Sequence, residues 1–235
     1  MTGADIEAAV MVALGLSLVD GVDALAQPYL TEALLRQHHV EERPKPTVDQ
    51  LRRTAVHEAG HTVWAALYWG PAVVASVSIR EADDANGRTS LSDELEDENR
   101  SSRADMWGHV AMGFAGLVAE ELIYGHDEVH GGGCANDIRK ATHAVRRLLG
   151  ELAGSPELGA VSIETIEVGI DSDRGSERMR AEMWDLASAE CRRIKSAVEA
   201  AMAANLRSVE AIADSLVDAP DLTLSGPVLS ELLGS

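Results

Sequence analysis

Hydrophobic residues recur with helical spacing in the middle of this chain, and polar residues mark where that spacing begins. Thr47, followed three residues later by Gln50, forms a capping box, which satisfies the free N–H groups of a first helical turn. The apolar period continues to residue 69, where the dipeptide Gly70-Pro71 interrupts it. The pattern predicts one helix over residues 47–69.

Further helical periods follow towards the C-terminus. One covers residues 102–124 and precedes Gly125, a common residue type just after a helix end. Asn136 is a favourable cap for a helix to about residue 152, whereas the stretch 154–175, interrupted by Gly and Ser, predicts a loop. The remaining periods predict helices over 176–204, 205–217 and 227–233.

A short region has the two-residue period of strands instead. Residues 72–80 are β-branched and alternating, and a similar run covers 88–91 after an acidic turn. These runs predict a small β-hairpin or sheet. The fold class expected from the whole pattern is mostly α, a helical domain with that small sheet and a C-terminal helical bundle.

The first 46 residues are organised differently. The pattern predicts two short helices over 4–18 and 21–39, and "EERPKP" at 41–46 has the prolines and mixed charge of a connector. The apolar run over 8–19 is about 12 residues long, shorter than the ~20 that a membrane span requires. We therefore expect a helical segment over 1–40, a linker over 41–46 and a separate domain over 47–235.

Composition excludes several classes of function. The formal net charge is -19, and the few Lys and Arg residues are interleaved with acids, so we expect no nucleic-acid partner. The only cysteines are Cys134 and Cys191, which favours a reducing compartment and a cytoplasmic location for this chain. No G-x-x-x-x-G-K-[ST] phosphate loop occurs, so any ATP hydrolysis must come from elsewhere.

The segment "AVHEAGHTV" lies inside the helix predicted over 47–69 and contains an H-E-x-x-H motif. Positions four apart share a helix face, so His57 and His61 can present both imidazoles to one metal ion. Glu58, one residue further on, then points beside the metal rather than at it. The motif predicts a catalytic zinc site, although two histidines packed in an ordinary helical core would give the same letters.

A catalytic zinc site needs a third ligand, and spacing alone does not select it. The long motif H-E-x-x-H-x-x-G-x-x-H is excluded, because Trp64 and Leu67 occupy the Gly and His positions. Carboxylates and histidines downstream are all candidates, with Cys134 beside them. The candidates are Glu120, Glu121, His126, Asp127, Glu128, His130, Cys134 and Asp137.

Three separated blocks, "AVHEAGHTV", "GFAGLVAEELIYG" and "GGGCANDIRKATHAVRRLL", resemble in the same order the peptidase domain of the FtsH family, ATP-dependent zinc metalloproteases of the M41 type. The resemblance covers roughly residues 47–233. The stretch "TGADIEAAV" at 2–10 is similar to the last helical part of the preceding ATPase module, its lid. The resemblance thus implies that residues 1–40 are the end of an ATPase lid.

The resemblance also implies roles for individual residues. It implies that His57, His61 and Asp137 bind Zn²⁺ and that Glu58 is the general base. It implies that Glu120 lies outside the ligand set and orients a ligand histidine by a hydrogen bond.

Two departures from the family pattern affect the site. The loop "HDEVHGGGC" is richer in His and Gly, which leaves His130 as a competitor for the metal. The strand region lacks the family's usual proline, so the register of a substrate-binding strand stays open. We expect either the segment containing Val73, Ser76 and Ile79 or its partner run 88–91 to align an extended peptide by backbone pairing.

Together these assignments predict a zinc metalloendopeptidase that degrades unfolded proteins and peptides, with Glu58 moving protons and no covalent intermediate. The resemblance implies a homo-hexamer and an AAA-type ATPase domain, in cis upstream or in trans. It further implies membrane association if the native protein extends upstream. Two alternatives remain: a zinc-stabilised assembly domain whose catalysis has lapsed, and a stand-alone soluble peptidase that needs no ATPase.

Overall fold

The computed structural model divides the chain into two compact units, Met1–Pro46 and Thr47–Ser235. It describes residues 10–14, 17–18, 22, 27, 29–31, 33, 46–80, 87–92, 95, 102–129, 131–150 and 173–234. Several predictions lie outside these residues: most of the helices over 4–18 and 21–39, the linker apart from Pro46, most of the loop over 154–175, and His130.

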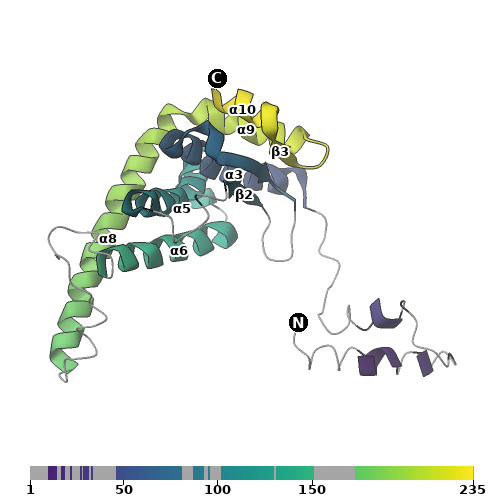
Figure 1. Cartoon of the computed structure of the whole chain (residues 1–235), viewed down its shortest axis with the longest axis horizontal. Helices are drawn as coiled ribbons and strands as arrows, with labels where there is room; N and C mark the ends of the chain where they lie inside the picture. The colour runs from purple at the N-terminus through teal and green to yellow at the C-terminus, as the bar shows by residue number, and fades with distance from the viewer. Residues whose placement is uncertain are drawn as a thin grey trace. The chain divides into compact units, whose positions relative to one another are not determined.

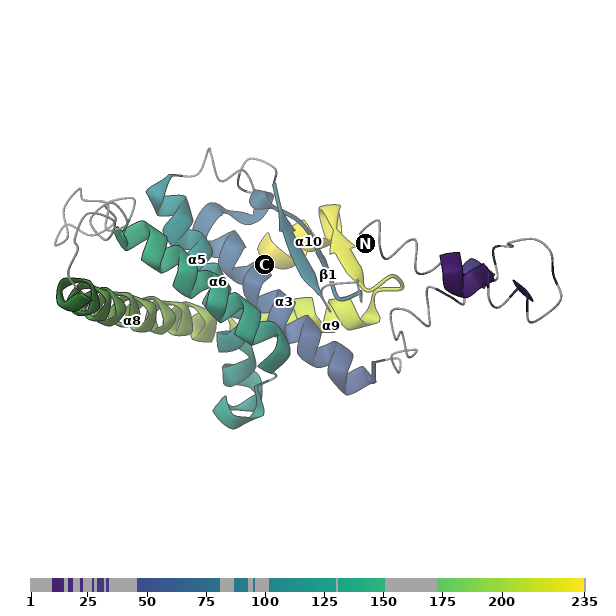
Figure 2. The same ribbon diagram turned by 90° about the horizontal axis from the view of Figure 1, so that it is seen from below.

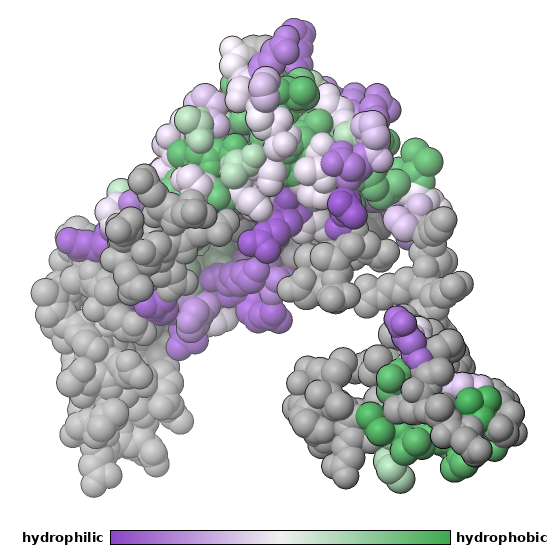
Figure 3. All heavy atoms as spheres, turned by 45° about the vertical axis from the view of Figure 1, so that its right-hand side comes forward, coloured by the Kyte–Doolittle hydropathy of each residue, from purple (hydrophilic) through white to green (hydrophobic). Residues whose placement is uncertain are grey.

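In the first unit, residues 10–14 are helical. Ala13 and Ala33 are buried within it, whereas Met11 and Leu18 are 66% and 70% exposed. Figure 3 shows hydrophobic side chains on the visible face of this unit. No helix among the described residues of either unit combines the length and the apolar composition needed to cross a membrane.

Helix α3 (Val48–Trp69) forms the centre of the second unit (Figure 1). The predicted capping box is present: the Gln50 amide donates to Thr47 Oγ1, and the Thr47 amide donates to Gln50 Oε1. The helix ends at Gly70, whose φ of 97° is open to glycine but strained for other residues. The helix boundaries predicted from the sequence are confirmed.

Helix α5 (Arg103–Tyr124) packs along α3 and is capped in the same way by Ser102 and Asp105. Three aromatic side chains near the end of α3 fix the alignment of the two helices. Trp64 Nε1 donates to the Gly108 carbonyl, Tyr68 Oη donates to the Ala104 carbonyl, and Trp69 Nε1 donates to Asp105 Oδ1. The end of α3 is thereby bonded to the start of α5.

The small sheet has three antiparallel strands in the order β2-β1-β3, with β1 at Val74–Ser78, β2 at Arg88–Leu91 and β3 at Thr223–Ser225. A 3₁₀ helix, η1 (Pro71–Val73), joins α3 to β1. The hairpin of β1 and β2 was expected, but the third strand, which arrives from near the C-terminus, was not.

The central place of β1 corrects one prediction. Ser76 lies opposite residues of both neighbouring strands, the Ile79 amide donates to the Leu222 carbonyl, and the Val73 carbonyl accepts from the Ser92 amide. Backbone groups already paired within the fold cannot also pair with a peptide. Val73, Ser76 and Ile79 therefore do not form a substrate-binding edge, and only the alternative run 88–91 remains.

Helix α6 (Gly131–Gly150) follows a short 3₁₀ helix, η2 (His126–Glu128), and packs against α5. It begins five residues before Asn136, so the predicted cap lies inside the helix rather than at its start. Glycines are poor helix formers, which is why the pattern placed the start too late. The early start matters because it sets the position of Asp137.

The C-terminal part is helical, as predicted. Helix α8 (Asp173–Ala204) packs against α5 and α6, α9 (Leu206–Asp218) packs against α3, and α10 (Gly226–Gly234) packs against α9 (Figures 1 and 2). One face of α9 is fully buried and joins the core: Val209, Ile212, Ala213 and Leu216. The fold is mostly α with a minor sheet, and α3 lies between the apolar face of α9 and the polar centre described next.

Candidate metal centre

Helix α3 brings two imidazoles together in the interior. His57 and His61 are one turn apart, their ring centroids are 4.7 Å apart, and the rings meet edge to face. Only 7% and 8% of their surfaces are exposed. Burying two polar rings is costly unless both nitrogens of each find partners, so their contacts indicate what the site does.

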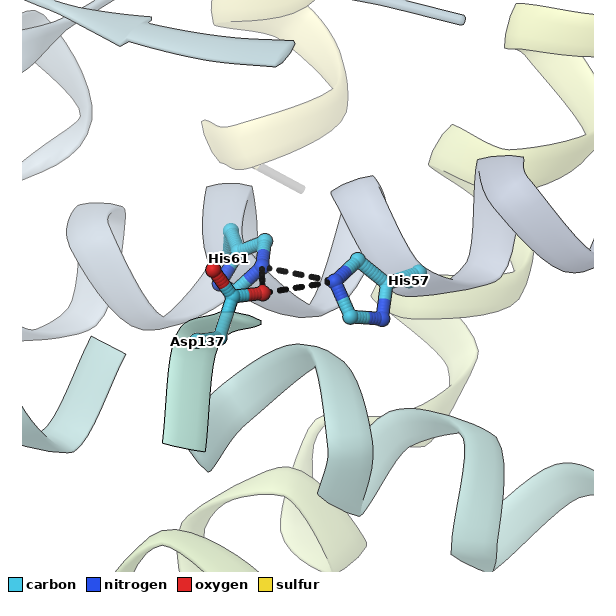
Figure 4. Close-up of side chains that lie close together, drawn as sticks. All are labelled: His57, His61 and Asp137. Atoms are coloured by element: carbon cyan, nitrogen blue, oxygen red, sulfur yellow. Dashed lines mark hydrogen bonds and ion pairs between the residues drawn. The ribbon is translucent and has the colours of Figure 1, made fainter. Parts of the chain in front are cut away.

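Asp137 reaches the two histidines from α6 (Figure 4). Its Oδ2 lies 3.0 Å from His57 Nε2 and 3.2 Å from His61 Nε2, and the two Nε2 atoms are 3.0 Å apart. The three atoms thus form a nearly equilateral triangle. Among the described residues, these three form one of two groups whose ligand atoms lie close enough to hold a metal ion.

The opposite nitrogens of the two rings fix their chemical state. His61 Nδ1 lies 2.8 Å from the Met112 carbonyl oxygen, which can only accept, so this nitrogen carries the proton. His57 Nδ1 lies 2.8 Å from Glu120 Oε1, and Glu120 is only 2% exposed. When both rings are neutral, this bonding directs the lone pairs of both Nε2 atoms at Asp137 Oδ2. Three electron-pair donors within 3.2 Å of one another require a cation between them.

The electrostatics of the site agree with that requirement. Burial alone lowers the pKa of His57, but hydrogen bonds to Asp137, Cys134 and Glu120 outweigh it and hold the pKa well above its usual value. Burial likewise raises the pKa of Asp137, yet hydrogen bonds with both histidines hold it well below the usual range. The surroundings therefore favour positive charge at the centre of the triangle, which a proton or a divalent ion can supply.

The donor set also suits zinc in its dimensions. Two ligands ~2.1 Å from a tetrahedral zinc ion lie about 3.4 Å apart, only slightly more than the 3.0–3.2 Å found here. Two imidazole nitrogens and one carboxylate oxygen are ligands typical of zinc sites that leave one coordination position open. The residues present fit the metal.

Glu58 is buried beside the triangle, with 6% of its surface exposed. Its negative charge contributes to the raised pKa of His57, so the carboxylate is close enough to act on the ring. Glu58 Oε2 accepts a hydrogen bond of 2.9 Å from Thr89 Oγ1 on β2. A buried carboxylate held next to the candidate ligands, but outside their triangle, can exchange protons with a molecule bound there.

Close packing keeps His57 in place. A Cβ atom added at Gly116 on α5 would lie 2.6–2.7 Å from three atoms of the His57 ring. A side chain at this position would push the ring away from its partners. The backbone at Gly116 therefore packs directly against the His57 ring. The sequence pattern of α5 does not predict this contact.

The remaining third-ligand candidates lie elsewhere. Glu121 binds Lys195 and His126, and His126 is largely exposed. Asp127 and Glu128 lie in the exposed 3₁₀ helix η2. Cys134 is buried and close to the centre, but its Sγ donates to Glu120 Oε1 over 3.3 Å, on the far side of His57 from the triangle. Burial raises the pKa of this thiol, which favours its protonated, hydrogen-bonding form.

The sequence comparisons can now be added to this geometry. The sequence model of peptidase family M41 matches residues 46–225, which is most of the chain. The chain belongs to peptidase family M41. The match includes all three residues of the triangle, as well as Glu58 and Glu120.

The chain is also similar to curated proteins with established names. An ATP-dependent zinc metalloprotease FtsH from Metamycoplasma arthritidis is 32% identical over 165 residues, covering 69% of this chain and 22% of the relative. The ATP-dependent zinc metalloprotease FtsH 1 from Thermoanaerobacter sp. is 31% identical over 204 residues, covering 85% of this chain and 32% of the relative. A chloroplastic relative from Capsicum annuum is 30% identical over 166 residues, covering 69% and 25%. The M41 chain described here spans less than a third of the length of these relatives.

Of the residues singled out in the sequence, His57, His61, Asp137, Glu58 and Glu120 come together in one buried cluster. Sequence reasoning missed Thr89 and Gly87 on the strand side and Gly116 on the α5 side. The alternating pattern of 88–91 gave a weak signal for Thr89, because it predicts a strand. It does not predict which side chain of that strand faces Glu58.

Proposed function

We propose that this M41 chain is a zinc-dependent endopeptidase domain that hydrolyses peptide bonds in unfolded proteins and flexible peptides. The main support is the convergence of three electron-pair donors, 3.0–3.2 Å apart, next to a buried carboxylate that does not join them. A purely structural zinc site uses four protein ligands and has no need of a neighbouring base.

In this proposal His57 Nε2, His61 Nε2 and Asp137 Oδ2 hold the ion. A bound zinc ion supplies Lewis acidity, which lowers the pKa of a coordinated water towards ~7 and polarises a carbonyl oxygen. Glu120 and the Met112 carbonyl hold the Nδ1 protons, so that both rings keep their Nε2 lone pairs directed inwards.

Glu58 moves the protons of the reaction. Its carboxylate takes a proton from the water as the water oxygen attacks the carbonyl carbon of the scissile peptide bond. As the carbon–nitrogen bond breaks, Glu58 returns that proton to the leaving amine. No side chain of the protein forms a covalent bond with the substrate.

Strand β2 offers a place for the substrate backbone. Within the described part of the chain, β2 pairs with β1 on one side and with no strand on the other. An extended peptide can therefore add to this edge by main-chain hydrogen bonds. Such pairing does not depend on side chains, which agrees with a degradative enzyme of low sequence specificity.

We further propose that an AAA-type ATPase, in cis or in trans, unfolds substrates for this domain within a ring of six. The relatives are named ATP-dependent, the matched part of this chain covers only 22% and 32% of their lengths, and the present sequence has no phosphate loop. The purified chain should sediment as an oligomer, cut casein and leave a stable folded protein intact with or without ATP. A strict monomer argues against the ring, and ATP-stimulated destruction of the folded protein argues against a separate motor.

The Glu58→Gln variant tests the proposal. The wild-type chain should bind about one zinc ion and cut a flexible peptide, whereas Glu58→Gln should bind zinc equally well and lose hydrolysis by roughly 10³-fold or more. Zinc content is measured by elemental analysis and cleavage with an internally quenched peptide. Full activity in Glu58→Gln contradicts the assigned base, and an inactive, zinc-loaded wild type favours a lapsed assembly domain.

A further inference from the structure

A threonine on β2 contacts the proposed base. Thr89 Oγ1 lies 2.9 Å from Glu58 Oε2 and 3.1 Å from the Glu58 carbonyl oxygen. A hydroxyl has one proton, and a charged carboxylate oxygen forms the stronger of two such hydrogen bonds. The Thr89 proton therefore points at the side chain of Glu58.

A second hydroxyl can fix the direction of that bond. Thr62, on α3 and fully buried, has its Oγ1 3.2 Å from Thr89 Oγ1. When Thr62 donates to Thr89, the Thr89 proton is left for Glu58. Two hydroxyls in series then end on one oxygen of the carboxylate.

The residue just before β2 also lies close to the carboxylate. A Cβ atom added at Gly87 would lie 2.7 Å from both Cγ and Oε1 of Glu58. Gly87 does not have a positive φ among the described glycines, so space rather than backbone conformation requires glycine here. One oxygen of Glu58 is thus next to Gly87 and the other is bonded to Thr89.

We propose that Thr89 is a positioning residue for Glu58, and that the start of β2 holds the base in its working orientation. A glutamate side chain has three rotatable bonds, and a base that swings freely is seldom aligned with the water. The hydrogen bond from Thr89 fixes Oε2 and leaves Oε1 to receive the proton. Thr89 is itself held by the sheet, where it lies opposite Val77 of the central strand.

This inference rests on the proposed peptidase activity, and isosteric substitution tests it. Thr89→Val keeps the shape and removes the hydroxyl, so kcat should fall by about 10-fold or more, the value of one hydrogen bond to a charged group. KM and zinc content should stay within about 2-fold of wild type. Thr89→Ser, which restores only the hydroxyl, should recover kcat to within about 3-fold. Thr142→Val is the matched control, because its hydroxyl bonds to the Ile138 carbonyl of α6 and to Cys191 of α8, neither of which belongs to the candidate site.

Gly87→Ala provides a second test that does not depend on Thr89→Val folding. The added methyl group should displace the Glu58 carboxylate and lower kcat with zinc content unchanged. Crystals of zinc-free protein give a readout apart from activity: the carboxylate should stay on β2 in wild type and Thr89→Ser, and leave it in Thr89→Val.

Three results overturn the inference. The first is a kcat within 2-fold of wild type in Thr89→Val or Gly87→Ala, and the second is an equal loss of kcat in Thr89→Ser and Thr89→Val. The third is a Glu58 carboxylate that has not moved in crystals of Thr89→Val. An inactive wild type with bound zinc overturns the proposed function itself, and this outcome is distinguishable because it precedes any comparison of variants.

Discussion

Helices α3 and α5 are alike in length and in how each begins and ends. Each has 22 residues, each starts with a capping box, and each ends at a glycine, with φ of 97° at Gly70 and 94° at Gly125. They differ in what they bury. The middle of α3 buries His57, Glu58 and His61, whereas the described part of α5 buries one ionisable side chain, Glu120.

The difference shows how the site is divided between the two helices. α3 carries two of the three atoms that face the proposed ion, the third coming from Asp137 on α6, and α5 supplies the partners of the two Nδ1 nitrogens, one through Glu120 and one through the Met112 carbonyl. A backbone carbonyl leaves no trace in a sequence motif. The groups that hydrogen-bond to the ligand histidines are therefore harder to predict than the ligands themselves. They are needed all the same, because they set the orientation of the imidazole rings.

Removing a group from α3 should have the largest effect. His61→Ala takes away one of three converging atoms, so we expect the loss of stoichiometric zinc and of peptide hydrolysis together. Elemental analysis after dialysis measures the first, and a quenched peptide the second. Asp137→Asn should behave in the same way from α6. If either variant keeps one tightly bound zinc ion, the substituted residue is not a ligand of that ion.

Changing the partner on α5 should weaken the site without abolishing it. Glu120→Gln keeps the shape but accepts the His57 Nδ1 proton less strongly, so zinc affinity should fall by about 10 to 100-fold. Competition with a chromophoric chelator measures the affinity. If Glu120→Gln loses its zinc while Asp137→Ala keeps it, the two roles are reversed: Glu120 is the ligand and Asp137 is not.

A methyl group on α5 tests the packing below the ring. Gly116→Ala places Cβ against the His57 ring, and overpacking of this kind costs about 1–3 kcal/mol, reduced by the ~1 kcal/mol that Ala gains as a helix former. Thermal unfolding of the zinc-free protein measures the cost. Gly234→Ala is the control, because no described atom lies within 4 Å of its added Cβ. Equal stability of the two variants would show that the ring can move aside.

The two capping boxes should differ in their response to pH. Hydrogen bonds from Ser102 and Trp69 lower the pKa of the Asp105 carboxyl in the folded protein. The charged carboxylate therefore stabilises the fold fully above the unfolded pKa of ~3.9. This stabilisation is lost as the pH falls through the lower pKa of the folded state. Asp105→Asn should cost about 0.5–1 kcal/mol at neutral pH, and the difference should narrow below about pH 4.

The cap at Gln50 carries no charge and provides the comparison for Asp105. Gln50→Ala should cost a similar amount at every pH at which the domain folds. Urea unfolding at several pH values measures both variants. If the free energy of unfolding that Asp105→Asn loses does not change with pH, the charge of Asp105 does not contribute to the stability of this cap.

The parts of the fold that the sequence predicts are those whose signals are local. Caps and stops near Thr47, Gly70 and Gly125 predict α3 and α5, and the four-residue spacing predicts that His57 and His61 share a face. The start of α6 was misplaced. Its first three residues are glycines, which are poor helix formers, so propensity alone places the start later than it lies.

What the sequence leaves open depends on contacts between distant segments. Eight residues were candidates for the third ligand, because only the packing of α6 decides which of them approaches the histidines. β3 was missed since three residues near the C-terminus carry too little pattern. Thr89 faces Glu58 because of the pairing register between β1 and β2, and register is set by the assembled sheet rather than by the run 88–91 alone.

The separation of the converging residues along the chain has a consequence for biosynthesis. Asp137 follows His57 by 80 positions, which at about 5–20 residues per second is ~4–16 s of translation. Once His61 has been added, the growing polypeptide carries both imidazoles but lacks Asp137 until the end of that interval. The proposed centre cannot form before α6 has been made and has docked, so we expect a nascent chain to lack the proposed hydrolytic activity until the domain is complete.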